Sequence, residues 1–172
     1  MLFFQDEGRF GRINNMSKCW VPPKTRAIVG QQMIREYIYT YTAVCPKTGD
    51  NFSLILPYAD TICMNMFLQK LSEEYAHYRI ILGMDSAGWH KSYGLKKPDN
   101  IVFFYLPPYS PELNPTEHIW DYIREKKEFN NHVFVSMDNI YDKLEIALFE
   151  LYHQKEIVKS MTNFSWISKA TC

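Results

Sequence analysis

The sequence predicts an α/β protein in which a mixed sheet, built from an antiparallel hairpin and parallel strands, is flanked by helices. Residues 37–45 and 52–56 alternate with period two around a turn at 47–50, which is typical of a β-hairpin. Residues 79–84 and 101–106 are continuous apolar runs, which are typical of parallel strands covered on both faces. Helical patterns follow these runs, so we expect helices on the faces of the sheet.

The N-terminal part of the chain predicts one strand and then irregular structure. Residues 1–5 are apolar enough for a short buried strand, which we expect to end on Asp6. Gly8 and Gly11 follow closely and break the strand pattern. We therefore expect an irregular segment from there to about Gly30.

Three helices are predicted by their start signals and by apolar residues at three- and four-residue steps. The first begins at Asp60 or Thr61, the second near Asn114-Pro115 and the third at about Ser136. The apolar stripe of the first helix is Met64, Phe67, Leu68, Leu71 and Tyr75, and that of the third is Ile140, Leu144, Leu148 and Leu151.

Length and composition are those of one ordinary globular domain. The chain has 172 residues, of which 47% are hydrophobic and 22% charged, so a disordered or fibrous protein is excluded. Lys plus Arg equals Asp plus Glu at 19 each, so the chain lacks the net basic charge of many nucleic-acid-binding proteins. A charged partner must therefore be met by local patches.

The cysteines and the N-terminus point to a cytoplasmic protein. Cys19, Cys45, Cys63 and Cys172 are far apart and form no CxxC pair, so we expect reduced thiols, without a zinc site or a disulfide framework. The first residues lack the basic and apolar regions of a signal peptide, and no run is long enough for a membrane span.

Three carboxylates are candidates for chemistry. Asp6 and Asp85 each follow an apolar strand, and ligands of open α/β sheets bind at the carboxyl ends of strands, although an Asp there is often only a turn residue. Glu117 stands at the start of the second helix, where it either caps its own backbone or faces a neighbouring strand end. Three carboxylates without Cys or His ligands would suit Mg²⁺ or Mn²⁺.

Three motifs resemble those of a known family. Residues 106–120, Leu-Pro-Pro-Tyr-Ser-Pro-Glu-Leu-Asn-Pro-Thr-Glu-His-Ile-Trp, resemble the third catalytic motif of mariner-superfamily transposases, in particular the DDE superfamily endonuclease type of bacterial insertion sequences. Residues 4–10 with 20–23 resemble the first motif, and residues 81–91 resemble the second. The three occur in the expected order and cover nearly the whole chain.

This resemblance implies an RNase H-like catalytic core with Asp6, Asp85 and Glu117 as the metal-binding triad. Such enzymes use two Mg²⁺ or Mn²⁺ ions to cleave double-stranded DNA at the ends of their own element. They then join the freed 3′ hydroxyl to a target, typically at a TA dinucleotide, and they work as dimers. We therefore expect a homodimer that performs DNA cleavage and strand transfer.

The resemblance also bears on domain organisation. Residues 1–172 are expected to be a single DDE transposase catalytic domain, because Met1 stands only five residues before Asp6. The N-terminal helix-turn-helix region of full-length relatives is expected to be absent. The chain would then be a truncated remnant, an isolated fragment, or the catalytic half of an element with a split reading frame, in which a separate DNA-binding chain recognises the element ends.

Other residues near the motifs have both a functional and an ordinary interpretation. His90 or His118 would contact phosphate or orient a ligand, and the basic side chains would hold phosphates, unless they belong to solvated surfaces. Trp89 and Tyr109 would stack on a splayed base or simply pack in the protein. Asp121 and Glu7 are alternative metal carboxylates. The basic candidates are Lys91, Lys96, Lys97, Arg124, Lys126 and Lys127.

Two other functions stay open from the residues. A stand-alone RNase H-like nuclease acting on hybrids or branched DNA would use the same metal chemistry, although the proline-rich third motif argues against it. An inactive remnant that only binds DNA or a partner would need none of the three carboxylates, and all three are present.

Overall fold

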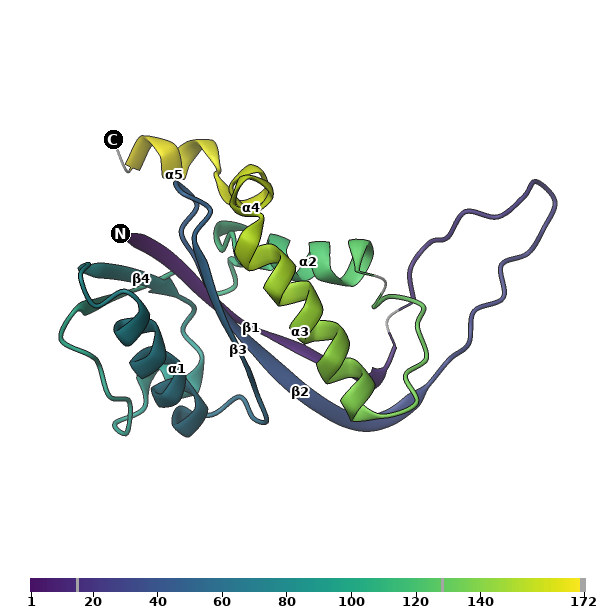
Figure 1. The fold of residues 1–172 in the computed structure, drawn as a ribbon, viewed down its shortest axis with the longest axis horizontal. Coiled ribbons are helices and arrows are strands. Elements are labelled where there is room, and N and C mark those ends of the chain that lie inside the picture. The colour runs from purple at the N-terminus through teal and green to yellow at the C-terminus, as the bar shows by residue number, and fades with distance from the viewer. Residues whose placement is uncertain (15, 128, 171–172) are drawn as a thin grey trace.

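In the computed structural model, which describes residues 1–14, 16–127 and 129–170, a five-stranded sheet separates two layers of helices (Figure 1). The strand order across the sheet is β3-β2-β1-β4-β5. The strands are β1 (Leu2–Ile13), β2 (Met33–Val44), β3 (Asn51–Leu56), β4 (Ile80–Met84) and β5 (Ile101–Tyr105). The helices are α1 (Thr61–Glu74), α2 (Glu117–Lys126), α3 (Met137–His153), α4 (Lys155–Thr162) and α5 (Ser165–Ala170).

The sheet is mixed, as the sequence predicts. β1, β2 and β3 pair antiparallel in chain order, whereas β4 pairs parallel with both β1 and β5. Helix α1 packs on one face over a core that includes Phe3 and Leu82, while α2 and α3 cover the other face around Phe4 and Trp120. Because side chains alternate along a strand, neighbouring residues of β1 belong to different cores.

The predicted end of the first strand is wrong, because β1 continues through both glycines to Ile13. A Cβ atom on Gly8 would lie 2.7 Å from the Trp120 ring, and one on Gly11 would lie 2.3 Å from the Glu36 carbonyl oxygen. Glycine here allows close packing within a paired strand and does not end it. Asp6 therefore lies in the middle of a strand.

The predicted helix starts at residues 60–61 and 136 are confirmed by their caps. The Asp60 side chain accepts a hydrogen bond from the Cys63 N–H, and the Ser136 side chain accepts one from the Asn139 N–H. Asp and Ser are preferred at such positions because their oxygens satisfy a free donor of the first turn. The sequence did not predict α4 or α5, whose 8 and 6 residues are too few for a clear periodicity.

The expected burial of β4 and β5 on both faces is only partly correct. Ile81 and Val102 are about half exposed, at 50% and 52%. Helix α3 contacts β1, β2 and β3, so the helical layer on this side leaves part of β4 and β5 uncovered. Strand β5 is also an edge of the sheet.

The remaining sequence expectations concern thiols, loops and membrane spans. Cys19, Cys45 and Cys63 are free thiols, whereas Cys172 lies outside the described residues. Residues 16–32 form the predicted irregular segment, a long loop that projects from the ends of β1 and β2 (Figure 1). None of the helices in the described ranges combines the length and hydropathy needed to cross a membrane.

Candidate active site

The three candidate carboxylates line one cavity of about 420 Å³ beside the loop between β5 and α2. Asp6 comes from β1, Asp85 follows β4 directly, and Glu117 is the first residue of α2. The parallel register pairs Phe4 with Gly83, and two residues further along each strand it brings Asp6 next to Asp85. The grouping that the sequence predicts therefore arises from sheet register and from the position of α2.

The start of α2 is tied to β1 by buried polar side chains. Asn114 Nδ2 donates to the Gln5 carbonyl oxygen at 3.0 Å, and Thr116 Oγ1 donates to the Phe4 carbonyl oxygen at 2.9 Å. The Asn114 side chain also accepts from the Thr116 N–H, which starts the helix. These contacts hold Glu117 over β1, a role of Asn114 and Thr116 that the sequence did not reveal.

Glu117 does not cap its own helix. Within the described part of the chain, its carboxylate accepts no hydrogen bond, so the capping interpretation is not realised. Burial raises its pKa, Arg124 opposes the rise, and the negative charges of Asp121 and Asp85 add to it. Glu117 is therefore a carboxylate without a local partner that faces other carboxylates.

Asp6 is held by the indole of α2. Trp120 Nε1 donates to Asp6 Oδ2 at 2.7 Å. Burial and the nearby charge of Glu117 nevertheless raise the pKa of Asp6 to about 8, and the Trp120 hydrogen bond opposes this rise. The charge of Glu7 also raises this pKa, and the contributions of Glu117 and Glu7 are those expected where carboxylates are gathered without a compensating cation.

We predict that Trp120→Phe destabilises the protein by about 1–3 kcal/mol, because it leaves the partly buried Asp6 carboxylate without its donor. The measurement is the free energy of unfolding in urea, with Trp166→Phe as the matched control. Trp166 is 40% exposed and packs edge-to-face on Phe4, so its replacement should cost less. Equal losses in the two variants would contradict the role of the Asp6 hydrogen bond.

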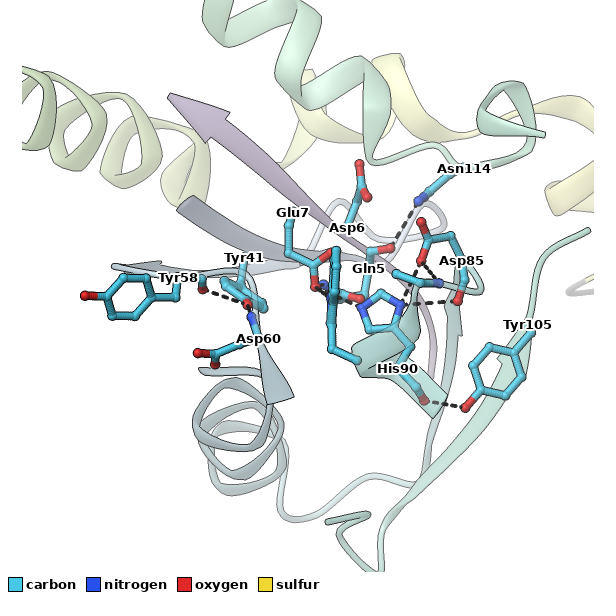
Figure 2. A network of polar contacts seen from close by, with 12 residues as sticks. Gln5, Asp6, Glu7, Tyr41, Tyr58, Asp60, Asp85, His90, Tyr105 and Asn114 are labelled. Carbon is cyan, nitrogen blue, oxygen red and sulfur yellow. Dashed lines mark hydrogen bonds and ion pairs between the residues drawn. The ribbon is translucent and has the colours of Figure 1, made fainter. Parts of the chain in front are cut away.

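Asp85 has a different environment from Asp6. Its Oδ1 atom lies 2.7 Å from His90 Nδ1 and accepts from the Ala87 N–H at 2.9 Å (Figure 2). The hydrogen bond with His90 lowers the pKa of Asp85 despite the opposing effect of burial. Asp85 is therefore the carboxylate of the three whose negative charge the protein compensates best.

The two alternative carboxylates are placed differently from the triad. Glu7 leaves β1 on the face opposite to Asp6, and its Oε1 atom accepts from Gln5 Nε2 at 2.9 Å (Figure 2). His90 Nε2 lies 2.9 Å from the same oxygen. Asp121 lies one turn beyond Glu117 on the exposed side of α2. Because side chains alternate along β1, Asp6 lies on the face next to α2 and Glu7 lies on the opposite face, next to His90.

Of the six basic residues singled out by sequence, Lys126 is exposed and Lys127 pairs with Glu150, and the other four fall into three groups. Arg124 lines a second cavity, of about 400 Å³, which shares Asp6 and Glu117 with the first and is also lined by Arg9, a residue that the sequence did not suggest. Lys91 lies over the Tyr105 ring, 5.0 Å from its centre. Lys96 and Lys97 line a cavity against α1 that contains none of the three carboxylates.

His90 and the two aromatic candidates also differ in place. The sequence offered His90 as a residue that contacts phosphate or orients a ligand, and the structure places its side chain completely buried between Glu7 and Asp85. Burial opposes protonation, but the hydrogen bonds with Asp85 and Glu7 raise the pKa of His90 to about 10. Trp89 packs against the core under α1, whereas Tyr109 is fully exposed at the rim of the carboxylate cavity.

The carboxylates are not arranged as a closed set of ligands. In the described ranges, no three His, Cys, Asp or Glu side chains are gathered closely enough to hold a metal ion as they stand. Like charges repel, and the two aspartates turn to Trp120 and His90 instead. The donor set is nevertheless made only of oxygen atoms, which suits a hard divalent cation.

Known proteins resemble this chain over most of its length. Residues 1–140 match the family described as DDE superfamily endonuclease, and this range contains all three carboxylates. The uncharacterized protein y4pE/y4sA of Sinorhizobium fredii (strain NBRC 101917 / NGR234) is 36% identical over 137 residues, which are 78% of this chain and 99% of that protein.

Solved structures of the Mos1 transposase share the fold. The pre-cleavage transpososome is 15% identical with a TM-score of 0.63, and the paired-end complex with the left transposon end is 16% identical with a TM-score of 0.61. The mariner Mos1 complex with Mn is 19% identical with a TM-score of 0.55. Each match covers 95% of this chain and 56% of the Mos1 chain. The likeness confirms the predicted RNase H-like fold.

Proposed function

The chain belongs to the DDE superfamily endonuclease family, and on that basis we propose that it is the catalytic domain of a transposase. It cleaves double-stranded DNA at the ends of its element and joins the freed 3′ hydroxyl to a target, typically at TA. The observation that carries the proposal is that Asp6, Asp85 and Glu117, far apart in sequence, line one cavity. The chain spans just over half of the Mos1 chains, so the activity of a whole transposase is part of the proposal.

The proposed cofactor is a pair of Mg²⁺ or Mn²⁺ ions held by Asp6, Asp85 and Glu117. DDE endonucleases depend on divalent metal ions, and Mos1 complexes have been solved with Mn and with Mg. Burial and, to a lesser extent, neighbouring carboxylates raise the pKa values of Asp6 and Glu117, and a bound cation would favour the charged form of both, which supports this assignment. Bound divalent ions activate the attacking water or hydroxyl and stabilise the leaving oxygen.

The protein's own side chains have distinct parts in the proposal. Trp120 keeps the Asp6 carboxylate at the cavity, and Asn114 and Thr116 keep Glu117 over β1. Arg124, which lines the adjoining cavity, would bind a phosphate of the DNA backbone. Because the formal net charge of the chain is zero, DNA contacts must come from such local groups.

The proposed partner is duplex DNA carrying the element ends. The Mos1 complexes contain transposon ends, and the shared fold supports the same class of substrate for this chain. A homodimer, and a separate DNA-binding chain from the same element, are further parts of the proposal. The homodimer follows from the family resemblance, and the separate chain would recognise the element ends.

The proposal is tested by incubating the protein with Mg²⁺ or Mn²⁺ and duplex DNA that carries the element's terminal repeats. We expect nicking at the repeat ends and joining to TA-containing target DNA, both lost in EDTA. Parallel reactions contain an RNA–DNA hybrid of the same sequence. Cleavage of the hybrid but not of the duplex would indicate an RNase H-like nuclease and overturn the proposal.

Tyr109 is predicted to stack on a base of the bound DNA. It is fully exposed, has a φ of 57° and lines the carboxylate cavity. Stacking on one base is worth about 1–3 kcal/mol, so Tyr109→Ala should weaken DNA binding roughly 5- to 150-fold. Tyr109→Phe keeps the ring and should bind as the wild type does. Fluorescence anisotropy checks this, and equal affinities of the Ala and Phe variants would contradict it.

A further inference from the structure

Glu7, His90 and Asp85 form a continuous chain of contacts beneath the candidate active site (Figure 2). His90 lies in a short 3₁₀ turn, Gly88–Lys91, and its side chain is completely buried. Its Nε2 atom lies 2.9 Å from Glu7 Oε1, and its Nδ1 atom lies 2.7 Å from Asp85 Oδ1. One ring therefore connects a residue of β1 with the residue that follows β4.

The surroundings fix the turn that carries His90 and the carboxylate that its ring contacts. The Tyr105 hydroxyl donates to the His90 carbonyl oxygen at 2.8 Å, and the His90 N–H donates to the Ala87 carbonyl oxygen at 3.0 Å. Glu7 is fixed as well, because its Oε1 atom also accepts from Gln5 Nε2. A rotation of the ring would leave buried polar groups without partners, which is costly in a low-dielectric interior.

Both contacts of the Asp85 carboxylate are made by the same oxygen atom, Oδ1. Oδ1 is occupied by His90 and by the Ala87 N–H, whereas Oδ2 has no partner among the described residues. The Asp85 side chain is 55% exposed, so without these contacts it would sample several rotamers. Fixing Oδ1 leaves Oδ2 as the atom directed away from His90 (Figure 2).

We propose that His90, anchored by Glu7, is a positioning residue that holds the Asp85 carboxylate in the orientation that binds the metal ion. This inference rests on the proposed function, because it takes Asp85 as a metal ligand. Outer contacts of this kind orient metal ligands and typically change affinity 10- to 100-fold. Glu7, a candidate ligand by its sequence position, is then the anchor of the ring and not a ligand.

Two substitutions of His90 separate positioning from stability. In His90→Asn, Nδ2 stands at the same bond distance from Cα as His Nδ1, so a donor to Asp85 is kept and the contact with Glu7 is lost. In His90→Gln, Nε2 corresponds to His Nε2, so the contact with Glu7 is kept and the donor to Asp85 is lost. His90→Asn should be the less stable variant, because the buried Glu7 carboxylate keeps its hydrogen bonds from Gln5 and Trp89 but loses the one from the His90 ring.

The measurements are Mn²⁺ affinity by electron paramagnetic resonance without DNA, and melting temperature in EDTA. We expect His90→Asn to stay within about 3-fold of wild-type affinity and His90→Gln to lose about 10-fold or more. A purely structural role predicts the opposite order, following the melting temperatures. If His90→Asn does not fold, Glu7→Gln/His90→Asn removes the buried charge and keeps the donor to Asp85.

The outcomes separate the positioning role from the proposed function. Equal Mn²⁺ affinities of the two variants, or weaker binding by His90→Asn than by His90→Gln, would overturn the positioning role and leave the proposed function standing. A folded wild-type chain that binds no Mn²⁺ would overturn the metal-dependent function itself.

Discussion

Glu117→Gln and Asp85→Asn are each expected to reduce metal-dependent DNA nicking by more than about 100-fold. Mutation of a residue that only orients a metal ligand typically costs up to about 100-fold, so loss of a ligand itself should cost more. Both changes keep the size and shape of the side chain and remove the negative charge that would bind a cation. Asp85 and Glu117 both line the cavity that also contains Asp6. Initial nicking rates in Mg²⁺ and in Mn²⁺, on the same duplex substrate, measure the loss.

Asp121→Asn is the matched control for these two variants. Asp121 lies one turn beyond Glu117 on the same helix but on its exposed side, and it is absent from the cavity lining. It should therefore keep a rate close to that of the wild type, with an unchanged melting temperature. Loss of activity in Asp121→Asn together with a normal rate in Glu117→Gln would show that the third ligand has been misassigned.

Local patterns were enough to predict most of this fold. The hairpin of β2 and β3 and helices α1 and α3 depend on alternation, helical periodicity and capping residues, which are visible in a single sequence. The extent of β1 was not predictable, because Gly8 stays in the strand by pairing with Thr40 of β2 and makes room for the ring of Trp120, which is 112 positions away in the chain. Contacts between distant residues leave no periodic signal.

The site shows the same limit at the level of single side chains. The position of Asp85 directly after a strand could be predicted from the apolar run before it. Glu117 could be predicted as a candidate ligand because it lies at a helix start and within residues 106–120, which resemble the third motif. The faces that Asp6 and Glu7 occupy depend on which neighbours cover each side of β1, and the burial of His90 depends on Glu7 of β1 and on Asp85 after β4. A sequence contains these residues but does not say which face each one occupies.

Asp6→Asn is expected to stabilise the protein in EDTA by a few kcal/mol near pH 7 and to abolish its stabilisation by Mn²⁺. The pKa of Asp6 is raised to about 8 by burial and by the charge of Glu117. Each tenfold increase in the proton affinity of a carboxylate corresponds to a cost of roughly 1.4 kcal/mol for its charged form, so removal of the charge should be favourable. Asn keeps an oxygen that can accept from Trp120 Nε1, so the packing of α2 should not change.

The direction of the pH dependence follows from the same raised pKa. A carboxyl whose pKa is higher in the folded state binds its proton more strongly there, so its contribution to stability falls as the pH rises from about 4 to about 8. The wild type should therefore lose stability relative to Asp6→Asn across this range in EDTA, as measured by urea unfolding at several pH values. Mn²⁺ should reduce the difference, because a cation bound between the carboxylates offsets their repulsion. If the free energies of unfolding of the two proteins differ by the same amount from pH 4 to pH 8, the raised pKa of Asp6 is contradicted. If Mn²⁺ stabilises both proteins equally, Asp6 is not a metal ligand.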